Sequence, residues 1–221
     1  MSPTLTIVAL WFTFALTHMG LSSLRVREAL VTRIGEAPFL GLYSVVALAA
    51  FVPLVWTYFA HKHAGTILWL IPLSQPLRWG IYCAMGVAFV LMVSGLVRPS
   101  PAGMVPTDST PRGALRITRH PLFMGLGIFG LLHLIPNGSA ADVAFFGGFP
   151  LFAVIGCWHQ DRRKLASGLA SYQAFYARTP FLPFTGGDTA VGLRELPAAI
   201  IVGGIGLTVV LRYFHPRWFG G

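Results

Sequence analysis

The feature that most limits the fold of this chain is a series of apolar stretches, each about as long as a bilayer is thick. A helix needs roughly 20 apolar residues to cross the hydrocarbon core. With 55% hydrophobic and only 10% charged residues, the chain has more apolar surface than a water-soluble domain can bury. We therefore predict an all-α, polytopic membrane bundle that forms a single domain over residues 1–221. Its transmembrane helices, about six in number, are expected near 3–24, 39–60, 79–97, 121–136, 140–159 and 196–213.

The basic residues indicate how the bundle is oriented. The net charge is +9, but the Lys and Arg residues are scattered in connecting segments, which argues against a nucleic-acid partner and favours the lipid bilayer. Cytoplasmic loops carry an excess of Lys and Arg. The loops after spans one, three and five are therefore predicted to be cytoplasmic and both chain termini to lie outside. These loops hold Arg25, Arg27, Arg33, Arg98, Arg112, Arg116, Arg119, Arg162, Arg163, Lys164, Arg178 and Arg194, which leaves Lys62, Arg78, Arg212 and Arg217 for the other side.

Two connecting segments have recognisable composition. Residues 98–118 are rich in Pro, Ser, Thr and Gly, which predicts irregular chain over the cytoplasmic face. Residues 161–185 include "KLASGLASYQAFYA", whose apolar and aromatic residues recur at helical spacing. This second segment is therefore expected to contain a helix at the membrane interface.

The letters "GLGIFG", from Gly125 to Gly130, match a dinucleotide-binding fingerprint, but they lie within a predicted membrane helix instead of after a strand. Small residues in such a helix allow close approach of a neighbouring helix or of a flat ring. Helix packing is the favoured interpretation, and a cofactor face formed by Gly125, Gly127 and Gly130 is the alternative.

Three of the seven histidines are candidates for function. Side chains that can ionise or bind metal are costly at membrane depth, so they mark functional sites by default. Four others are interpreted as hydrated interfacial residues at helix ends: His61, His63, His159 and His215. The candidates are His18, His120 and His133, and for His18 and His133 the alternative is a buried imidazole that hydrogen-bonds to a neighbouring helix.

His120 and His133 suggest different chemistry. His120 lies between Arg119 and Pro121, and a proline at the first position frees a helix N-terminus. Arg119, His120 and the unpaired N–H groups there are expected to hold an anionic carboxylate or phosphate. His133 shares its span with the glycine face, and imidazoles from facing helices commonly hold b-type haem in a bundle.

Several segments together closely resemble the NnrU family, bacterial membrane proteins associated with denitrification and nitric oxide metabolism. They are "HMGLSSLRVREALVTRIGEAPFLGLYSVVALAAFVPLVW", "RITRHPLFMGLGIFGLLHLIPNGSAADVAFFGGF", "DRRK", "YARTPFLPF" and "HPRWFG". This family is similar to the plant zeta-carotene isomerase, a b-haem membrane enzyme that moves a cis double bond. The resemblance implies haem b with His18 and His133 as iron ligands, and a multi-pass protein of the bacterial inner membrane. Gly130 stands where that isomerase has a cysteine, so redox switching through such a thiol is not expected.

A second resemblance points to a methyltransferase. "RHPLFMG" followed by "YQAFYARTPFLPF" is similar to membrane isoprenylcysteine and phospholipid methyltransferases, in which two such segments enclose S-adenosylmethionine. Those enzymes carry paired glutamates after the following helix, where this chain reads "QDRRKLAS", and Phe123 replaces their usual tyrosine.

Depth in the membrane bears on the iron ligands. At about 1.5 Å per helical residue, His133 lies roughly 20 Å from His120 towards the outer face. The charge distribution places His18 nearer the inner face, so on depth alone His120 is the better match for His18. The resemblance favours His18 with His133.

We therefore expect an NnrU-type protein of nitrogen-oxide metabolism that holds haem b, with a small apolar or redox molecule as ligand. An isomerase-like activity on an apolar substrate is one hypothesis, and whether the protein is an enzyme is left open. The alternatives are a methyltransferase that uses S-adenosylmethionine and a non-enzymatic assembly factor that associates with components of a nitrogen-oxide reductase.

Overall fold

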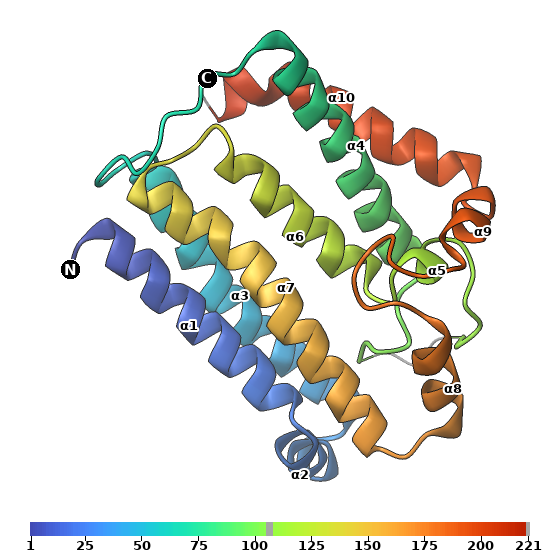
Figure 1. Ribbon diagram of the computed structural model, residues 1–221. Helices are drawn as coiled ribbons and strands as arrows, with labels where there is room; N and C mark the ends of the chain where they lie inside the picture. The colour runs from blue at the N-terminus through green and yellow to red at the C-terminus, as the bar shows by residue number, and fades with distance from the viewer. Residues whose placement is uncertain (105–107, 220–221) are drawn as a thin grey trace. The chain divides into compact units, whose positions relative to one another are not determined.

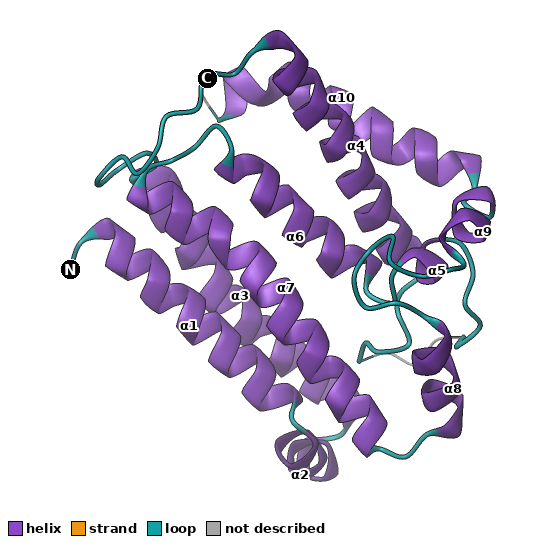
Figure 2. Ribbon diagram, in the orientation of Figure 1, coloured by secondary structure: helices purple, strands orange, loops and turns teal. Residues whose placement is uncertain are grey.

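The computed structural model describes residues 1–104 and 108–219, and these residues form helices joined by loops (Figure 2). Within these ranges the one isolated β-bridge joins Ile67 to Ser139. The helices are α1 Pro3–Ser22, α2 Leu24–Ile34, α3 Glu36–Ala60, α4 Gln75–Val97, α5 Ala114–Ile117, α6 Pro121–Leu134, α7 Ala140–Ala166, α8 Ala170–Arg178, α9 Thr189–Arg194 and α10 Ala198–Trp218.

Five of these helices, α1, α3, α4, α7 and α10, are long and apolar enough to cross a membrane. The predicted all-α, polytopic class is thereby confirmed. Between 11% and 39% of the most apolar stretch of each helix is buried inside the protein, which leaves the remaining apolar surface for lipid. The sixth predicted span corresponds to α6, whose 14 residues measure about 21 Å against a hydrocarbon core of roughly 30 Å. The described residues therefore contain five full-length apolar helices and one shorter apolar helix.

The segments that connect the long helices agree in part with those predicted from the sequence. The segment after α4 is irregular up to α5, as predicted, apart from residues 105–107, which lie outside the described residues. The predicted interfacial helix corresponds to α8, whereas α7 continues to Ala166 beyond its predicted end. The α2 helix was not anticipated, because its alternating Arg and apolar residues follow the first span without a proline or glycine between them.

The chain divides into two compact units. Unit 1 consists of Met1–Pro72 and His133–Phe152, and unit 2 consists of Leu73–Leu132 and Ala153–Gly221. Helices α6 and α7 each contribute residues to both units.

In unit 1, the helices α1, α3 and the first half of α7 lie side by side (Figure 1). Trp11 of α1 joins this helix to α7, because its indole N–H donates to the Phe145 carbonyl oxygen at 3.1 Å. The same indole lies against Gly148, where any side chain would collide with it. Phe14, Phe51 and Phe149 surround these residues at ring-centroid distances of 5.2 to 6.4 Å from Trp11 or one another. The interior of unit 1 is therefore largely aromatic.

In unit 2, the helices are held together by close approach at glycines. A Cβ atom added at Gly125 of α6 would lie 2.6 Å from the Ala88 carbonyl oxygen of α4. Gly204 of α10 approaches α4 in the same way, at 2.7 Å from the Val90 Cα atom. Small residues at helix contacts are typical of membrane bundles, where packing supplies much of the association energy. Gly125 therefore serves helix packing, the interpretation that the sequence favoured.

Gly125→Ala should destabilise unit 2, because the added methyl group meets a backbone oxygen that cannot rotate away. Overpacking of this kind costs about 1–3 kcal/mol. The matched control is Gly206→Ala in α10, where nothing lies within 4 Å of the added Cβ atom. Thermal unfolding in detergent would measure both variants. A Gly125→Ala protein as stable as the control would contradict the packing role.

The orientation stays a prediction that a fusion experiment can test. A reporter fused after the last residue should be active on the outer side of the membrane, because twelve of the sixteen Lys and Arg fall in the loops assigned to the inside. Activity on the cytoplasmic side would mean that the short helix α6 does not cross the bilayer.

Candidate functional site

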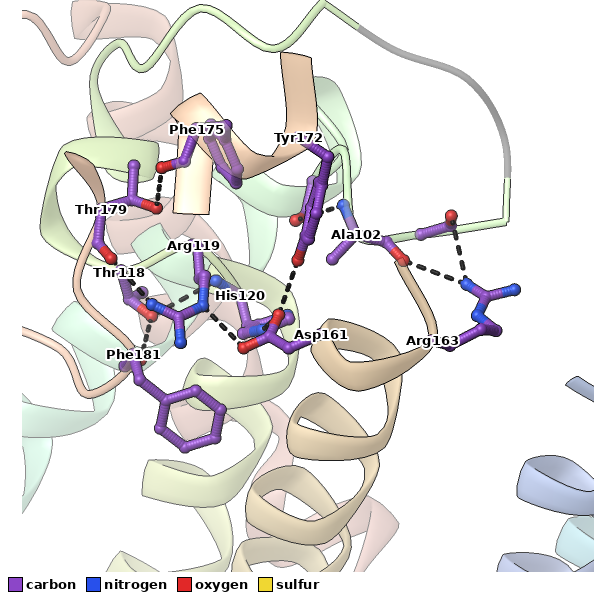
Figure 3. A network of polar contacts seen from close by, with 12 residues as sticks. Ala102, Thr118, Arg119, His120, Asp161, Arg163, Tyr172, Phe175, Thr179 and Phe181 are labelled. Carbon is purple, nitrogen blue, oxygen red and sulfur yellow. Dashed lines mark hydrogen bonds and ion pairs between the residues drawn. The ribbon is translucent and has the colours of Figure 1, made fainter. Parts of the chain in front are cut away.

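A buried cluster of polar side chains surrounds Asp161, near the end of α7 in unit 2 (Figure 3). The Asp161 carboxylate accepts hydrogen bonds from Arg119 Nε at 2.7 Å, His120 Nε2 at 2.8 Å and Tyr172 Oη at 2.7 Å. Asp161 is 3% exposed and His120 is 1% exposed. A carboxylate with this little contact with water depends on these donors.

The chain around Arg119 and His120 is anchored to a distant segment by hydrogen bonds. The Arg119 backbone N–H donates to the Pro180 carbonyl oxygen at 2.9 Å, and the Thr118 hydroxyl donates to the Phe181 carbonyl oxygen at 2.6 Å. The Thr118 hydroxyl oxygen in turn accepts from the His120 backbone N–H at 3.3 Å. Residues 118–120, just before α6 begins at Pro121, are therefore fixed against residues 179–181.

The Arg119 guanidinium is held on several sides. Its Nη1 atom donates to the Thr179 carbonyl oxygen at 2.7 Å. Its flat face lies 4.1 Å from the centre of the Tyr176 ring and 5.2 Å from that of Phe181, a cation–π arrangement. Arginine suits this position because its planar group can stack and donate several hydrogen bonds at once.

The anion beside Arg119 and His120 is a carboxylate of this chain. The sequence predicts that these two residues hold an anionic ligand, and the structure places Asp161 in contact with both. An external carboxylate or phosphate would have to compete with Asp161 for the same donors. Burial and the adjacent Asp161 carboxylate also raise the pKa of the Tyr172 phenol, which keeps it a hydrogen-bond donor at neutral pH.

His120 is oriented by this carboxylate. Because Asp161 accepts, Nε2 of His120 must carry the proton that it shares, and the buried Nδ1 atom has no hydrogen-bond partner among the residues that the structure describes. The ring also packs edge-on against Phe181 at 5.6 Å. The Nε2 atom of His120 is thus engaged within the protein.

His18 lies in the aromatic interior of unit 1. Its imidazole is 5.1 Å from the Phe14 ring in a stacked arrangement, 4.6 Å from Tyr43 and 5.5 Å from Phe152. These three neighbours belong to α1, α3 and α7. The side chain therefore packs against α3 and α7, four residues before α1 ends at Ser22.

His133, at the end of α6, also belongs to unit 1 and contacts α7. Its ring stacks on Phe146 at 4.6 Å with an interplanar angle of 15°. Phe146 and Phe152, the α7 neighbours of the two histidines, are six residues apart, which is about 9 Å along a helix. The two imidazoles therefore contact α7 at points about 9 Å apart along that helix.

The other predicted residues have simpler positions. Gly130 is buried in α6, as are Gly125 and Gly127. His61 and His63 are exposed beyond the end of α3, as predicted for interfacial residues. Across residues 1–104 and 108–219, no three His, Cys, Asp or Glu side chains gather as a metal-ligand group would.

Sequence reasoning did not single out Asp161 or Tyr172 as site residues. Asp161 gave a usable signal, because a carboxylate near the end of a long apolar helix needs a partner. Tyr172 gave none, because an aromatic residue on an interfacial helix has the same pattern whether or not its hydroxyl is bonded.

The helices and the buried polar groups at their ends define a multi-pass helical membrane protein, and comparison with known proteins places it in a family. The model of the NnrU protein family matches residues 6–221. The chain therefore belongs to the NnrU family. No solved structure matches it significantly.

The chain is also similar to proteins named 15-cis-zeta-carotene isomerase, chloroplastic. The protein of Zea mays is 26% identical over 174 residues, which are 77% of this chain and 47% of that protein. The protein of Arabidopsis thaliana is 26% identical over 192 residues, which are 83% of this chain and 50% of that protein. The chain thus spans about half the length of the curated relatives that it matches.

Asp161→Asn should destabilise the protein strongly, since it leaves Arg119 buried without a charged partner. Breaking a buried ion pair from one side costs about 3–5 kcal/mol. The control is Asp188→Asn, which breaks a pair between Arg116 and a side chain that is 54% exposed and should cost at most about 1 kcal/mol. Denaturant unfolding of the two variants gives the comparison. Equal losses would show that Asp161 is not the anchor of this cluster.

Proposed function

We propose that this protein is an isomerase-type enzyme of the bacterial inner membrane that acts on a cis double bond of an apolar polyene. The observation that carries the proposal is the pair His18 and His133 in the aromatic interior of unit 1, in a chain whose relatives are named 15-cis-zeta-carotene isomerase. A long polyene is soluble in the bilayer, so its enzyme is expected to be a helical membrane protein.

The donor set of unit 1 fits a b-type haem. Two imidazoles, from α1 and α6, both contact α7 within six residues of each other, and imidazole is a principal protein ligand of haem iron. The surrounding rings, which include Phe14, Tyr43 and Phe146, offer the apolar contact that a flat porphyrin needs. We propose haem b as the cofactor, and His18 and His133 as the residues that would hold its iron.

Haem, when bound, would supply an iron centre able to withdraw electron density and so weaken a double bond. The protein's own part is to position the substrate and to exclude water. The rings of Trp11, Phe51 and Phe149 pack against one another and make the interior of unit 1 apolar. Rotation about a carbon–carbon bond requires no proton from the protein, which agrees with an interior of this composition.

The contacts of Asp161 favour isomerase-type chemistry over methyl transfer. In the methyltransferase hypothesis, residues 119–125 and 172–184 enclose S-adenosylmethionine. In the structure, residues 118–120 are hydrogen-bonded directly to residues 179–181. The carboxylate of Asp161 is already engaged by three donors and is not available to the hydroxyl groups of a nucleoside.

The test uses the purified protein in detergent after haem supplementation. The wild-type protein should show a Soret band and convert 15-cis-zeta-carotene to its isomer, as followed by chromatography. His18→Ala and His133→Ala should each lose the low-spin spectrum and lower the rate to background. His120→Ala is the matched control, because its Nε2 atom is bonded to Asp161, and it should keep the spectrum.

Other outcomes identify the alternatives. S-adenosylmethionine binding at micromolar concentration without a Soret band would replace this proposal with a methyltransferase. Binding of neither molecule, with co-purification of a nitrogen-oxide reductase subunit, would indicate an assembly factor. A spectrum lost in His120→Ala and kept in His133→Ala would reject the proposed ligand pair.

A further inference from the structure

The turn that follows α3 in unit 1 carries two exposed histidines, His61 and His63, on either side of Lys62. The side chain of His63 is 57% exposed, and its backbone has a φ angle of 61°. Residues other than glycine rarely adopt this left-handed conformation. The neighbouring chain is held by hydrogen bonds between residues 64–68 and 138–141, which fix the turn against the start of α7.

Each of these imidazoles uses the same nitrogen within the protein. The Nδ1 atom of His61 lies 3.1 Å from the Thr57 carbonyl oxygen, and that of His63 lies 3.1 Å from Asp142 Oδ2. A carbonyl oxygen can only accept, so Nδ1 of His61 must carry the hydrogen. The lone pair of a neutral His61 is therefore on Nε2, at the far side of the ring.

The same argument applies to His63, because Asp142 is placed to accept. Asp142 is buried at the start of α7 and accepts from the Tyr58 hydroxyl at 2.9 Å and from the Ser139 backbone N–H at 3.2 Å. Its contact with His63 completes a set of three donors. Nδ1 of His63 therefore donates, and the Nε2 lone pair of the neutral ring is again available for a ligand.

Histidines that bind metal typically have this arrangement. One ring nitrogen donates to a carboxylate or backbone carbonyl, which fixes the tautomer and orients the other nitrogen towards the ion. Here one ring has the carbonyl partner and the other has the carboxylate partner. The two Cα atoms are at most about 7.6 Å apart, since two Cα–Cα steps of 3.8 Å separate them. A separation of this size is compatible with one ion between the two Nε2 atoms, at metal–nitrogen distances of about 2.0–2.1 Å.

We propose that His61 and His63 form a binding site for a divalent transition-metal ion through their Nε2 atoms. Imidazole suits Cu²⁺, Ni²⁺ and Zn²⁺, and among these ions Cu²⁺ binds a given nitrogen site most tightly. No third His, Cys, Asp or Glu ligand joins them among the described residues. Water completes the coordination, so the ion is exchangeable and has open positions for a further ligand. This site does not depend on the proposed haem or on the proposed isomerase activity.

The experiment titrates tag-free protein in detergent with Cu²⁺ and follows it by electron paramagnetic resonance and calorimetry. The wild-type spectrum should show one tight ion coupled to two nitrogens. His61→Asn and His63→Asn should each leave one nitrogen and weaken binding at least tenfold. Asparagine is chosen because it tolerates the left-handed conformation of residue 63. The control His215→Asn, in α10 of the other unit, should change neither measurement.

Two further variants separate the carboxylate's role from a general effect on α7. Asp142→Asn should weaken Cu²⁺ binding about 10–100-fold, as is usual for the partner of a metal-binding histidine. Tyr58→Phe removes a different hydrogen bond to Asp142 and should leave the affinity unchanged. The histidine variants alone decide the proposal. The proposal would be overturned if both histidine variants kept the coupling of Cu²⁺ to two nitrogens. It would also be overturned if the wild-type protein bound Cu²⁺ no more tightly than either variant.

Discussion

A buried carboxylate, Asp161, is the constraint on which the packing around the C-terminal end of α7 in unit 2 depends. Taking a charge out of water costs several kcal/mol, and this cost is recovered only when the charge is paired and hydrogen-bonded. Its three donors come from residues before α6 and from α8, so satisfying one side chain brings three segments together. The hydrogen bonds between residues 118–120 and residues 179–181 can then form, because the two segments are already in contact.

Unit 1 is stabilised differently, by aromatic packing around Trp11. The indole inserts against Gly148 and donates its one N–H to the Phe145 carbonyl oxygen, so a large amphipathic ring is buried without an unsatisfied donor. His18 and His133 are accommodated in this setting by stacking on phenylalanines. A pair of imidazoles in an apolar, aromatic surrounding is suited to a flat, apolar ligand, and this is why unit 1 and not the Asp161 cluster carries the proposed function.

The sequence predicts the helices well because bilayer thickness imposes a length on each span that composition alone reveals. The expected stretches 39–60 and 79–97 correspond to α3 and α4, whose observed bounds begin three or four residues earlier. The partners of the polar side chains were not predictable. Arg119 and Asp161 are 42 residues apart, and nothing in the local pattern of either indicates the other. Only the cost of burying a charge says that a partner must exist, and it does not say which one.

The depth of His18 and His133 shows a second limit of sequence reasoning. Counting residues assumes that helices run straight across the membrane from matched ends, so an error in the starting level of α1 is carried to every residue on it. In the structure, His18 contacts Phe152 and His133 contacts Phe146, so the positions of both histidines can be compared along the same helix, α7.

Near each end of α7, an aspartate of that helix contacts a tyrosine and a histidine from other segments. Tyr58, Asp142 and His63 form one group in unit 1, and Tyr172, Asp161 and His120 form the other in unit 2. In each group a buried carboxylate accepts from a phenol and from an imidazole. The difference is exposure, since the side chain of His63 is 57% exposed and that of His120 is 0% exposed. A carboxylate-oriented imidazole can act on a ligand only if its second nitrogen is accessible. The hydrogen bond between carboxylate and imidazole therefore stabilises the fold around His120, whereas at His63 it orients a ring that is accessible to a ligand.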